Sequence, residues 1–110
     1  MRVLVTGATG FVGSRLVPAL LDAGHGVTVL VRDAGRYDPQ AGVRVVEGDL
    51  LEPSSYAAAL DVDAAYYLVH SMTARDDFAA RDRRAADGFA RAASEAGVDR
   101  VVYLGGLGED

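Results

Sequence analysis

The sequence predicts an α/β fold in which helices cover a doubly wound parallel sheet of five strands. Five short apolar runs, rich in β-branched residues, recur along the 110-residue chain and end at glycine or at polar clusters. Helical patterns lie between several of these runs, and parallel strands need such crossover connections because a tight turn cannot join them. Three glycines spaced three residues apart follow the first run, in the stretch "VTGATGFVGSRL".

The predicted strands lie, in chain order, in "RVLVTG", "VTVLVRD", "VRVVEG", "AAYYLVHS" and "RVVYLGG". We predict the spatial order 3-2-1-4-5. In this order the chain reverses direction between the first and fourth strands, and the crevice above their C-terminal ends is where such sheets bind ligands. The sequence stops at Asp110, so we expect the fold to be truncated after the fifth strand.

The first predicted helix spans residues 11–23, between the first two strands. Its apolar side chains recur at helical spacing, and "DAGHG" supplies glycine where the helix should end. These side chains are Val12, Leu16, Val17, Leu20 and Leu21. Pro18 lies inside the helix and removes one main-chain hydrogen bond, so we expect a bend.

The later connections differ in kind. The stretch "DAGRYDPQAG" carries Pro39 and two glycines, which predicts a loop rather than a crossover helix. The stretch "EPSSYAAAL" predicts a short helix with Pro53 near its first turn. Residues 76–96 form the longest predicted helix, and opposite charges four residues apart, such as Asp77 and Arg81, indicate that one of its faces is solvated.

The composition argues against several functions. The net charge is −5 and all eleven basic residues are arginines among more numerous carboxylates, so we expect no nucleic-acid partner. With no cysteine and two isolated histidines, the chain predicts no disulfide, thiol nucleophile or metal site. No apolar run is long enough for a signal peptide or a bilayer span, so we expect a cytoplasmic protein without a membrane partner.

The three spaced glycines predict a phosphate-binding turn. Gly7 would allow the tight turn out of the first strand, Gly10 would let the main chain approach a pyrophosphate, and Gly13 would let the helix pack close to the sheet. The first N–H groups of that helix would then point at the anion. The alternative is a glycine-rich turn that binds no ligand.

The stretch "TGATGFVG" resembles the T-G-x-x-G-x-x-G fingerprint of the short-chain dehydrogenase/reductase superfamily, in its extended and atypical branches. The stretches "AGHGVTVLVRD", "VEGDL" and "AGVDRVVYLGGLG" resemble its second strand, adenine-side turn and fifth strand. "YYLVHSM" and the pattern around Arg32 are most similar to the NmrA-like NAD(P)H-binding branch. The resemblance implies that residues 1–110 form a Rossmann-like NAD(P)-binding domain, the N-terminal part of a longer protein.

The resemblance also implies which residues bind the cofactor. Those expected to line the phosphates are Gly7, Thr9, Gly10, Phe11, Val12 and Gly13. Asp49 and Leu50 would flank the adenine, although Asp49 could instead be an ordinary turn aspartate. His70 would lie near the nicotinamide, at the end of the fourth strand.

The end of the second strand favours NADP(H) over NAD(H). NAD-specific sites place a carboxylate there for the ribose 2′-hydroxyl, whereas NADP sites need a cation. Here Val31 stands at the carboxylate position and Arg32 follows, so its guanidinium would bind the 2′-phosphate. Asp33 could itself contact a 2′-hydroxyl, or pair with Arg32, and Arg32 could be an ordinary exposed arginine.

The usual catalytic pair of the superfamily is absent from this chain. That pair is Y-x-x-x-K, in which an ammonium lowers the pKa of a phenol, and the chain contains no lysine. The serine expected near the end of the fifth strand is replaced by glycine and leucine at positions 105–108. The remaining catalytic candidates are His70 and Ser71, which could equally be ordinary residues at a strand end.

These observations leave three functions open. The first is the cofactor-binding domain of an NADP(H)-dependent oxidoreductase that acts on an unidentified small molecule, with catalytic residues beyond this chain. The second is a non-catalytic NADP(H)-binding sensor or regulator, and the third is an interaction module without a ligand. With a loop between the second and third strands and no predicted helix after the fifth, we expect only the first helix on one face of the sheet. Parallel sheets normally need both faces covered, so the apolar surface left open over the fourth and fifth strands should make the isolated chain either self-associate or be only marginally stable.

Overall fold

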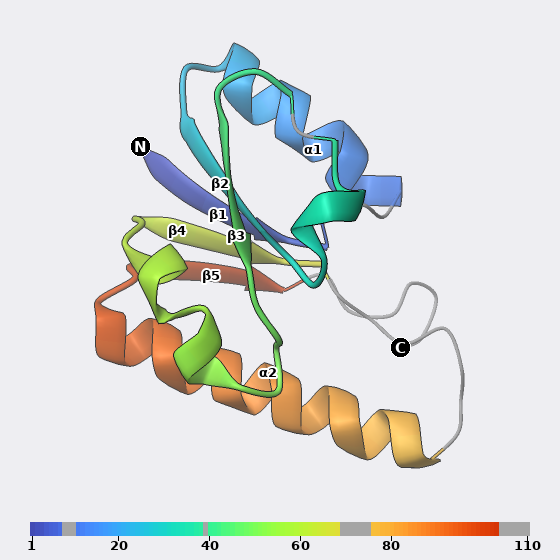
Figure 1. Ribbon diagram of the computed structural model, residues 1–110. Coiled ribbons are helices and arrows are strands. Elements are labelled where there is room, and N and C mark those ends of the chain that lie inside the picture. The colour runs from blue at the N-terminus through green and yellow to red at the C-terminus, as the bar shows by residue number, and fades with distance from the viewer. Residues whose placement is uncertain (8–10, 39, 69–75, 104–110) are drawn as a thin grey trace.

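The computed structural model describes residues 1–7, 11–38, 40–68 and 76–103, which form a single parallel sheet with helices on both of its faces (Figure 1). The strand order is β3-β2-β1-β4-β5, so the predicted order is confirmed. The strands are β1 (Arg2–Thr6), β2 (Gly26–Val31), β3 (Val43–Glu47), β4 (Ala64–Tyr67) and β5 (Arg100–Tyr103).

The register brings the C-terminal ends of the strands to the same edge of the sheet. Thr6 at the end of β1 pairs with Leu30 on β2 and with Tyr67 on β4. Tyr67 in turn pairs with Tyr103 at the end of β5. Residues that follow these strands therefore gather at one edge, although they are far apart in the chain.

Helix α1 (Phe11–Asp22) covers one face of the sheet and packs on β1 and β2. Valine side chains from these strands meet Val17 and Leu20 of the helix in a buried cluster. Pro18 lies inside α1 and does not end it, because the helix continues to Asp22. The predicted helix is confirmed.

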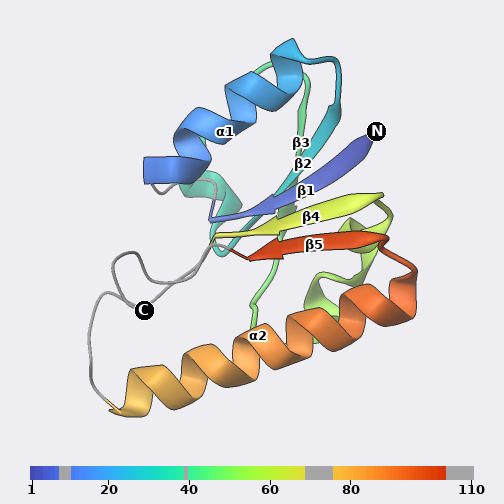
Figure 2. The same cartoon turned by 180° about the vertical axis from the view of Figure 1, so that it is seen from behind.

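Helix α2 (Asp76–Ala96) covers the opposite face, as the two views from front and back show (Figures 1 and 2). Phe89 of this helix is fully buried between two tyrosine rings, with centroid distances of 5.7 Å to Tyr56 and 5.0 Å to Tyr67. The ring of Tyr67 also packs against that of Tyr103 of β5, at a centroid distance of 5.5 Å and a tilt of 48°. Aromatic packing of this kind fixes the helix against the sheet, because each ring removes a large apolar area from water.

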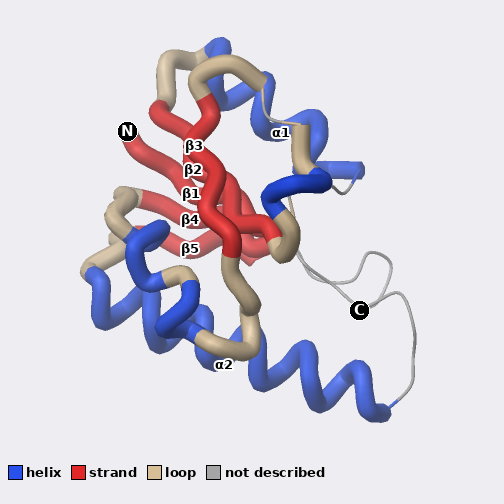
Figure 3. Tube along the Cα trace, in the orientation of Figure 1, coloured by secondary structure: helices blue, strands red, loops and turns tan. Residues whose placement is uncertain are grey.

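The two connections that flank β3 contain only short 3₁₀ helices. Residues 34–36 form η1 between β2 and β3, so the predicted absence of a crossover helix is confirmed. The short helix predicted in "EPSSYAAAL" is present as two successive 3₁₀ helices, η2 (Pro53–Ser55) and η3 (Ala57–Leu60), rather than one α-helix. Figure 3 shows these turns beside the strands, with η2 and η3 on the α2 side.

The α1 side of the sheet is less covered toward β5. The described members of the core cluster beneath α1 include side chains from β1, β2, β3 and β4 but none from β5. Val102 of β5 pairs with the half-buried Tyr66 of β4 on this side and is 37% exposed. Where the structure describes it, the α1 side of the sheet therefore leaves β5 partly open at Val102.

Candidate functional site

The candidate site lies where β1, β2, β3 and β4 end. Hydrogen bonds continue the sheet one step past the strands, since Leu68 N–H donates to Thr6 O at 3.1 Å and Gly48 N–H donates to Val31 O at 2.9 Å. Thr6 is fully buried, and its Oγ1 donates to Tyr66 O at 3.3 Å. This edge is thus rigid up to the first residue of each connecting loop.

Gly7 is the first residue after β1, and its place in the structure requires glycine for two reasons. Its φ angle is +86°, which side chains with a Cβ rarely adopt. A Cβ built on Gly7 would also lie 3.1 Å from Leu68 Cβ and 3.2 Å from Leu68 C. The tight turn predicted for Gly7 is present, and it brings the end of β1 against the end of β4.

The other glycine-motif residues are placed only in part. Thr9 and Gly10 lie outside the described residues, whereas the main chain of Phe11 and Val12 begins α1. Gly13 is buried inside this helix. The N-terminus of α1, with its positive dipole end, therefore follows Gly7 and the glycine motif in the chain, as phosphate binding requires.

Arg32 follows β2 directly and is exposed. Among the described residues it forms no ion pair with Asp33. Oδ1 of Asp33 accepts a hydrogen bond from Gly35 N–H at 3.1 Å and caps the 3₁₀ helix η1. The interpretation that Asp33 pairs with Arg32 is therefore wrong.

Asp49 lies in a tight turn after β3. Its Oδ1 accepts from Leu51 N–H at 2.9 Å, and its carbonyl oxygen accepts from Glu52 N–H at 2.9 Å. One carboxylate oxygen thus stabilises the turn, as the alternative interpretation of Asp49 proposed. The described residues place no donor on Oδ2, so this oxygen stays available to a ligand. Leu50, half-buried, packs on the core beneath α2.

Sequence analysis did not identify Ser55 as part of this turn. Asp49 N–H donates to Ser55 Oγ at 2.9 Å across six residues. Ser55 lies two residues after Pro53 in the predicted short helix, and nothing in that pattern links its side chain to Asp49.

The predicted catalytic candidates His70 and Ser71 lie outside the described residues, and β4 ends at Tyr67. Tyr56, which is fully buried, does not have the properties of an activated phenol. Burial, with a smaller effect of Tyr103, raises the pKa of Tyr56 to about 12, and its hydroxyl has no hydrogen-bond partner within the described part of the chain. A general acid in this superfamily needs the opposite shift, so the structure gives no support for Tyr56 as a catalyst.

A separate groove of about 380 Å³ lies between η2 and α2. Its lining residues are Leu51, Pro53, Arg84, Asp87, Gly88 and Arg91, none of which belongs to the predicted site. In the described ranges no set of three or more metal-ligating side chains is close enough to hold an ion. No described helix is both long and apolar enough to cross a membrane.

The sequence matches a family model and is similar to several known proteins. Residues 7–110 match a family model described as NAD(P)H-binding. A 3-diazoavenalumate denitrifying reductase from Streptomyces sp is 43% identical over 113 residues, which cover 93% of this chain and 36% of the relative. The photosystem II assembly factor Ycf39 from Synechocystis sp. is 33% identical over 111 residues, which cover 94% of this chain and 33% of the relative.

The fold is similar to that of the enzyme WbmG from Bordetella bronchiseptica, whose structure was solved in complex with NAD. The TM-score is 0.79 at 29% sequence identity, and the similar region covers 94% of this chain and 36% of WbmG. The chain therefore spans about a third of the length of each of these three proteins.

Proposed function

Because the chain belongs to the NAD(P)H-binding family, we propose that it is the NADP(H)-preferring cofactor domain of a longer oxidoreductase that acts on a small molecule. The cofactor would lie along the edge where β1, β2 and β3 end. In this arrangement the start of α1 would bind the pyrophosphate, Arg32 the 2′-phosphate, and the Asp49 turn the adenine. The bound nicotinamide would supply or accept a hydride.

The observation that carries the proposal is the close contact between Gly7 and Leu68. A Cβ at position 7 would press on Leu68, so the first residue after β1 must be one without a side chain. A pyrophosphate needs this bare main chain in order to reach the N–H groups at the start of the helix. The residues present therefore fit a dinucleotide.

The preference for NADP(H) rests on Arg32. Its guanidinium is exposed at the end of β2 and, among the described residues, is not paired with Asp33, whose Oδ1 caps η1. A planar guanidinium can donate two parallel hydrogen bonds to a phosphate, and a charge-assisted bond is stronger than a neutral one. Since Val31 offers no carboxylate for a 2′-hydroxyl, the site favours the phosphorylated ribose.

Calorimetric titration of the chain with NADPH and with NADH tests this proposal. We expect tighter binding of NADPH, and we expect 2′,5′-ADP to compete with it. Equal affinity for the two cofactors would contradict the NADP(H) preference while leaving the cofactor domain intact. No binding of either cofactor would contradict the proposed function itself.

A non-catalytic NADP(H) sensor is the second candidate, and one observation favours it. The relative Ycf39 is an assembly factor rather than an enzyme by name. The two candidates differ in turnover by the longer protein that contains this chain. Oxidation of NADPH in the presence of a reducible substrate supports the oxidoreductase, whereas binding without turnover across carbonyl and alkene substrates supports the sensor.

A further inference from the structure

The hydroxyl of Ser55 joins two successive turns that follow β3. Glu52 N–H donates to Asp49 O at 2.9 Å and closes the first turn, and Ser55 N–H donates to Glu52 O at 2.8 Å and closes the second. Asp49 N–H then donates to Ser55 Oγ at 2.9 Å, so the end of the second turn is tied to the start of the first.

The hydroxyl proton of Ser55 completes this link. Ser55 Oγ lies 2.6 Å from Glu52 O and 3.1 Å from Asp49 O. A hydroxyl has one proton to donate, and the shorter distance assigns it to Glu52 O. Ser55 Oγ therefore accepts a hydrogen bond from Asp49 N–H and donates one to Glu52 O. A side chain without a hydroxyl cannot do both.

Gly48 allows the two turns to fold back on the sheet. A Cβ at this position would lie 3.1 Å from both Ser55 O and Ser55 Oγ, and 3.2 Å from Leu30 Cδ1. Because Gly48 N–H is bonded to Val31 O, the main chain here cannot move away from β2 without breaking that bond. Ser55 is thus held against the end of β3 from both sides.

We propose that Ser55 is a positioning residue for the adenine end of the cofactor, an inference that rests on the proposed function. Its hydroxyl fixes the main chain of Asp49, and Oδ1 of Asp49 is fixed in addition by Leu51 N–H. The remaining oxygen, Oδ2, is then held in one direction before any ligand arrives. A preorganised acceptor binds an adenine amino group more tightly than a mobile one, because less conformational entropy is lost on binding.

The position of Ser55 separates this role from a purely structural one. Ser55 and its hydrogen bonds to Asp49 are exposed, so removing the hydroxyl leaves Asp49 N–H to water rather than in an apolar core. The expected result is a looser turn in a folded domain. Ser54 is also exposed and adjoins Ser55, so it provides a matched control.

The experiment compares Ser55→Ala, Ser55→Thr and Ser54→Ala by titration with NADPH and with 2′,5′-ADP, which carries only the adenine half. Ser55→Ala should raise the Kd of both ligands about fivefold, the effect of losing one modest hydrogen bond. Ser54→Ala should bind as the unmodified chain does, and Ser55→Thr, which keeps the hydroxyl, should restore most of the affinity. Amide hydrogen exchange at Asp49 should be faster in Ser55→Ala alone.

The outcomes distinguish this inference from the proposed function. If the unmodified chain binds NADPH and Ser55→Ala binds it equally well, the positioning role is wrong and the cofactor domain stands. Equal losses in Ser54→Ala and Ser55→Ala would also overturn the role. If the unmodified chain binds neither ligand, both proposals fall. Should Ser55→Ala not fold, Gly48→Ala displaces Ser55 instead and should raise both Kd values in the same way.

Discussion

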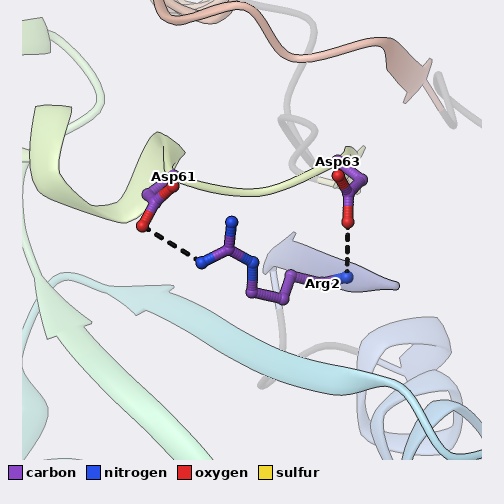
Figure 4. A network of polar contacts seen from close by, with 3 residues as sticks. All are labelled: Arg2, Asp61 and Asp63. Carbon is purple, nitrogen blue, oxygen red and sulfur yellow. Dashed lines mark hydrogen bonds and ion pairs between the residues drawn. The ribbon is translucent and has the colours of Figure 1, made fainter.

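The main-chain N–H of Arg2 donates to Oδ2 of Asp63 at 2.8 Å, between residues 61 positions apart in the chain (Figure 4). Asp63 N–H returns a bond to Arg2 O at 2.8 Å, and Asp63 O accepts from Asp99 N–H at 3.0 Å. These contacts join the starts of β1, β4 and β5. The edge of the sheet opposite the candidate site is thus stabilised by the protein's own polar groups.

Asp63→Ala should lower the free energy of unfolding by about 1 kcal/mol, because Arg2 N–H loses its hydrogen-bond acceptor within the protein. Asp61→Ala is the matched control. Its ion pair with Arg2 Nη1, at 3.2 Å, joins two exposed side chains, and such pairs contribute little. Urea unfolding of both variants measures the difference. Equal losses would show that the main-chain bond to Asp63 has no special importance.

Gly7→Ala should destabilise the domain more than Gly24→Ala. Both glycines have positive φ angles, +86° and +91°, so each substitution should cost about 1 kcal/mol in main-chain strain. Only Gly7 also meets a neighbour, since nothing lies within 4 Å of a Cβ built on Gly24. Thermal unfolding compares the two variants, and a titration with NADPH should show reduced affinity for Gly7→Ala alone. A smaller loss of stability in Gly7→Ala would contradict the close contact with Leu68.

Arg32→Ala should weaken NADPH binding by about 2 kcal/mol and leave NADH binding nearly unchanged, because only NADPH carries the 2′-phosphate. Arg100→Ala removes the same charge at the start of β5, on the opposite edge of the sheet, and should change neither affinity. Titration calorimetry at fixed salt concentration gives both constants. Equal losses for the two cofactors in Arg32→Ala would refute its role in choosing between them.

The stability of the domain should decrease above pH 10, and Tyr56 is one cause. Burial raises its pKa to about 12 in the folded chain, whereas an unfolded phenol ionises near 10. The unfolded state therefore releases the proton first as the pH rises, and stability falls between about pH 10 and 12.

Tyr56→Phe should reduce this loss of stability at alkaline pH. At pH 7 it should change stability by less than about 1 kcal/mol, because the hydroxyl has no partner among the described residues. Urea unfolding from pH 7 to 11 checks both statements, and an unchanged alkaline slope would contradict them.

The strand order and the main helices could be predicted from the sequence because they follow from local patterns. Alternating apolar runs and helices determine a parallel sheet, and the proline and glycines after Asp33 exclude a crossover helix there. The details of the site depend instead on which side chains form hydrogen bonds or ion pairs with each other, and the sequence pattern does not contain this information. Whether Asp33 pairs with Arg32 or caps a turn is decided by a few ångströms of main-chain geometry, and the cap is what the structure shows.

The same limit explains why Ser55 and Asp63 were not predicted. Asp63 accepts from a main-chain group 61 positions away, so its role depends on how β1 and β4 are placed relative to each other. Ser55 accepts from Asp49 N–H across six residues, and this bond depends on the geometry of two successive turns that the sequence pattern does not contain. The cofactor roles of Thr9, Gly10, His70 and Ser71 stay predictions, since they lie outside the described residues.

The last prediction concerns self-association through the α1 side of β4 and β5. Val102, 37% exposed, pairs with Tyr66, and Tyr103 at the end of β5 is 48% exposed on the other face. Apolar side chains on a parallel sheet are normally covered, so we expect two copies of the 110-residue chain to bury this surface at high concentration. Val102→Asp should shift the chain toward monomer, because it places a charge on the apolar surface that would be buried between the two copies. Ala90→Asp, at an exposed position of α2, adds the same charge elsewhere and should leave the association unchanged. Light scattering over a concentration series measures the mass of each variant. A monodisperse monomer of the unmodified chain at high concentration would show that this surface needs no partner.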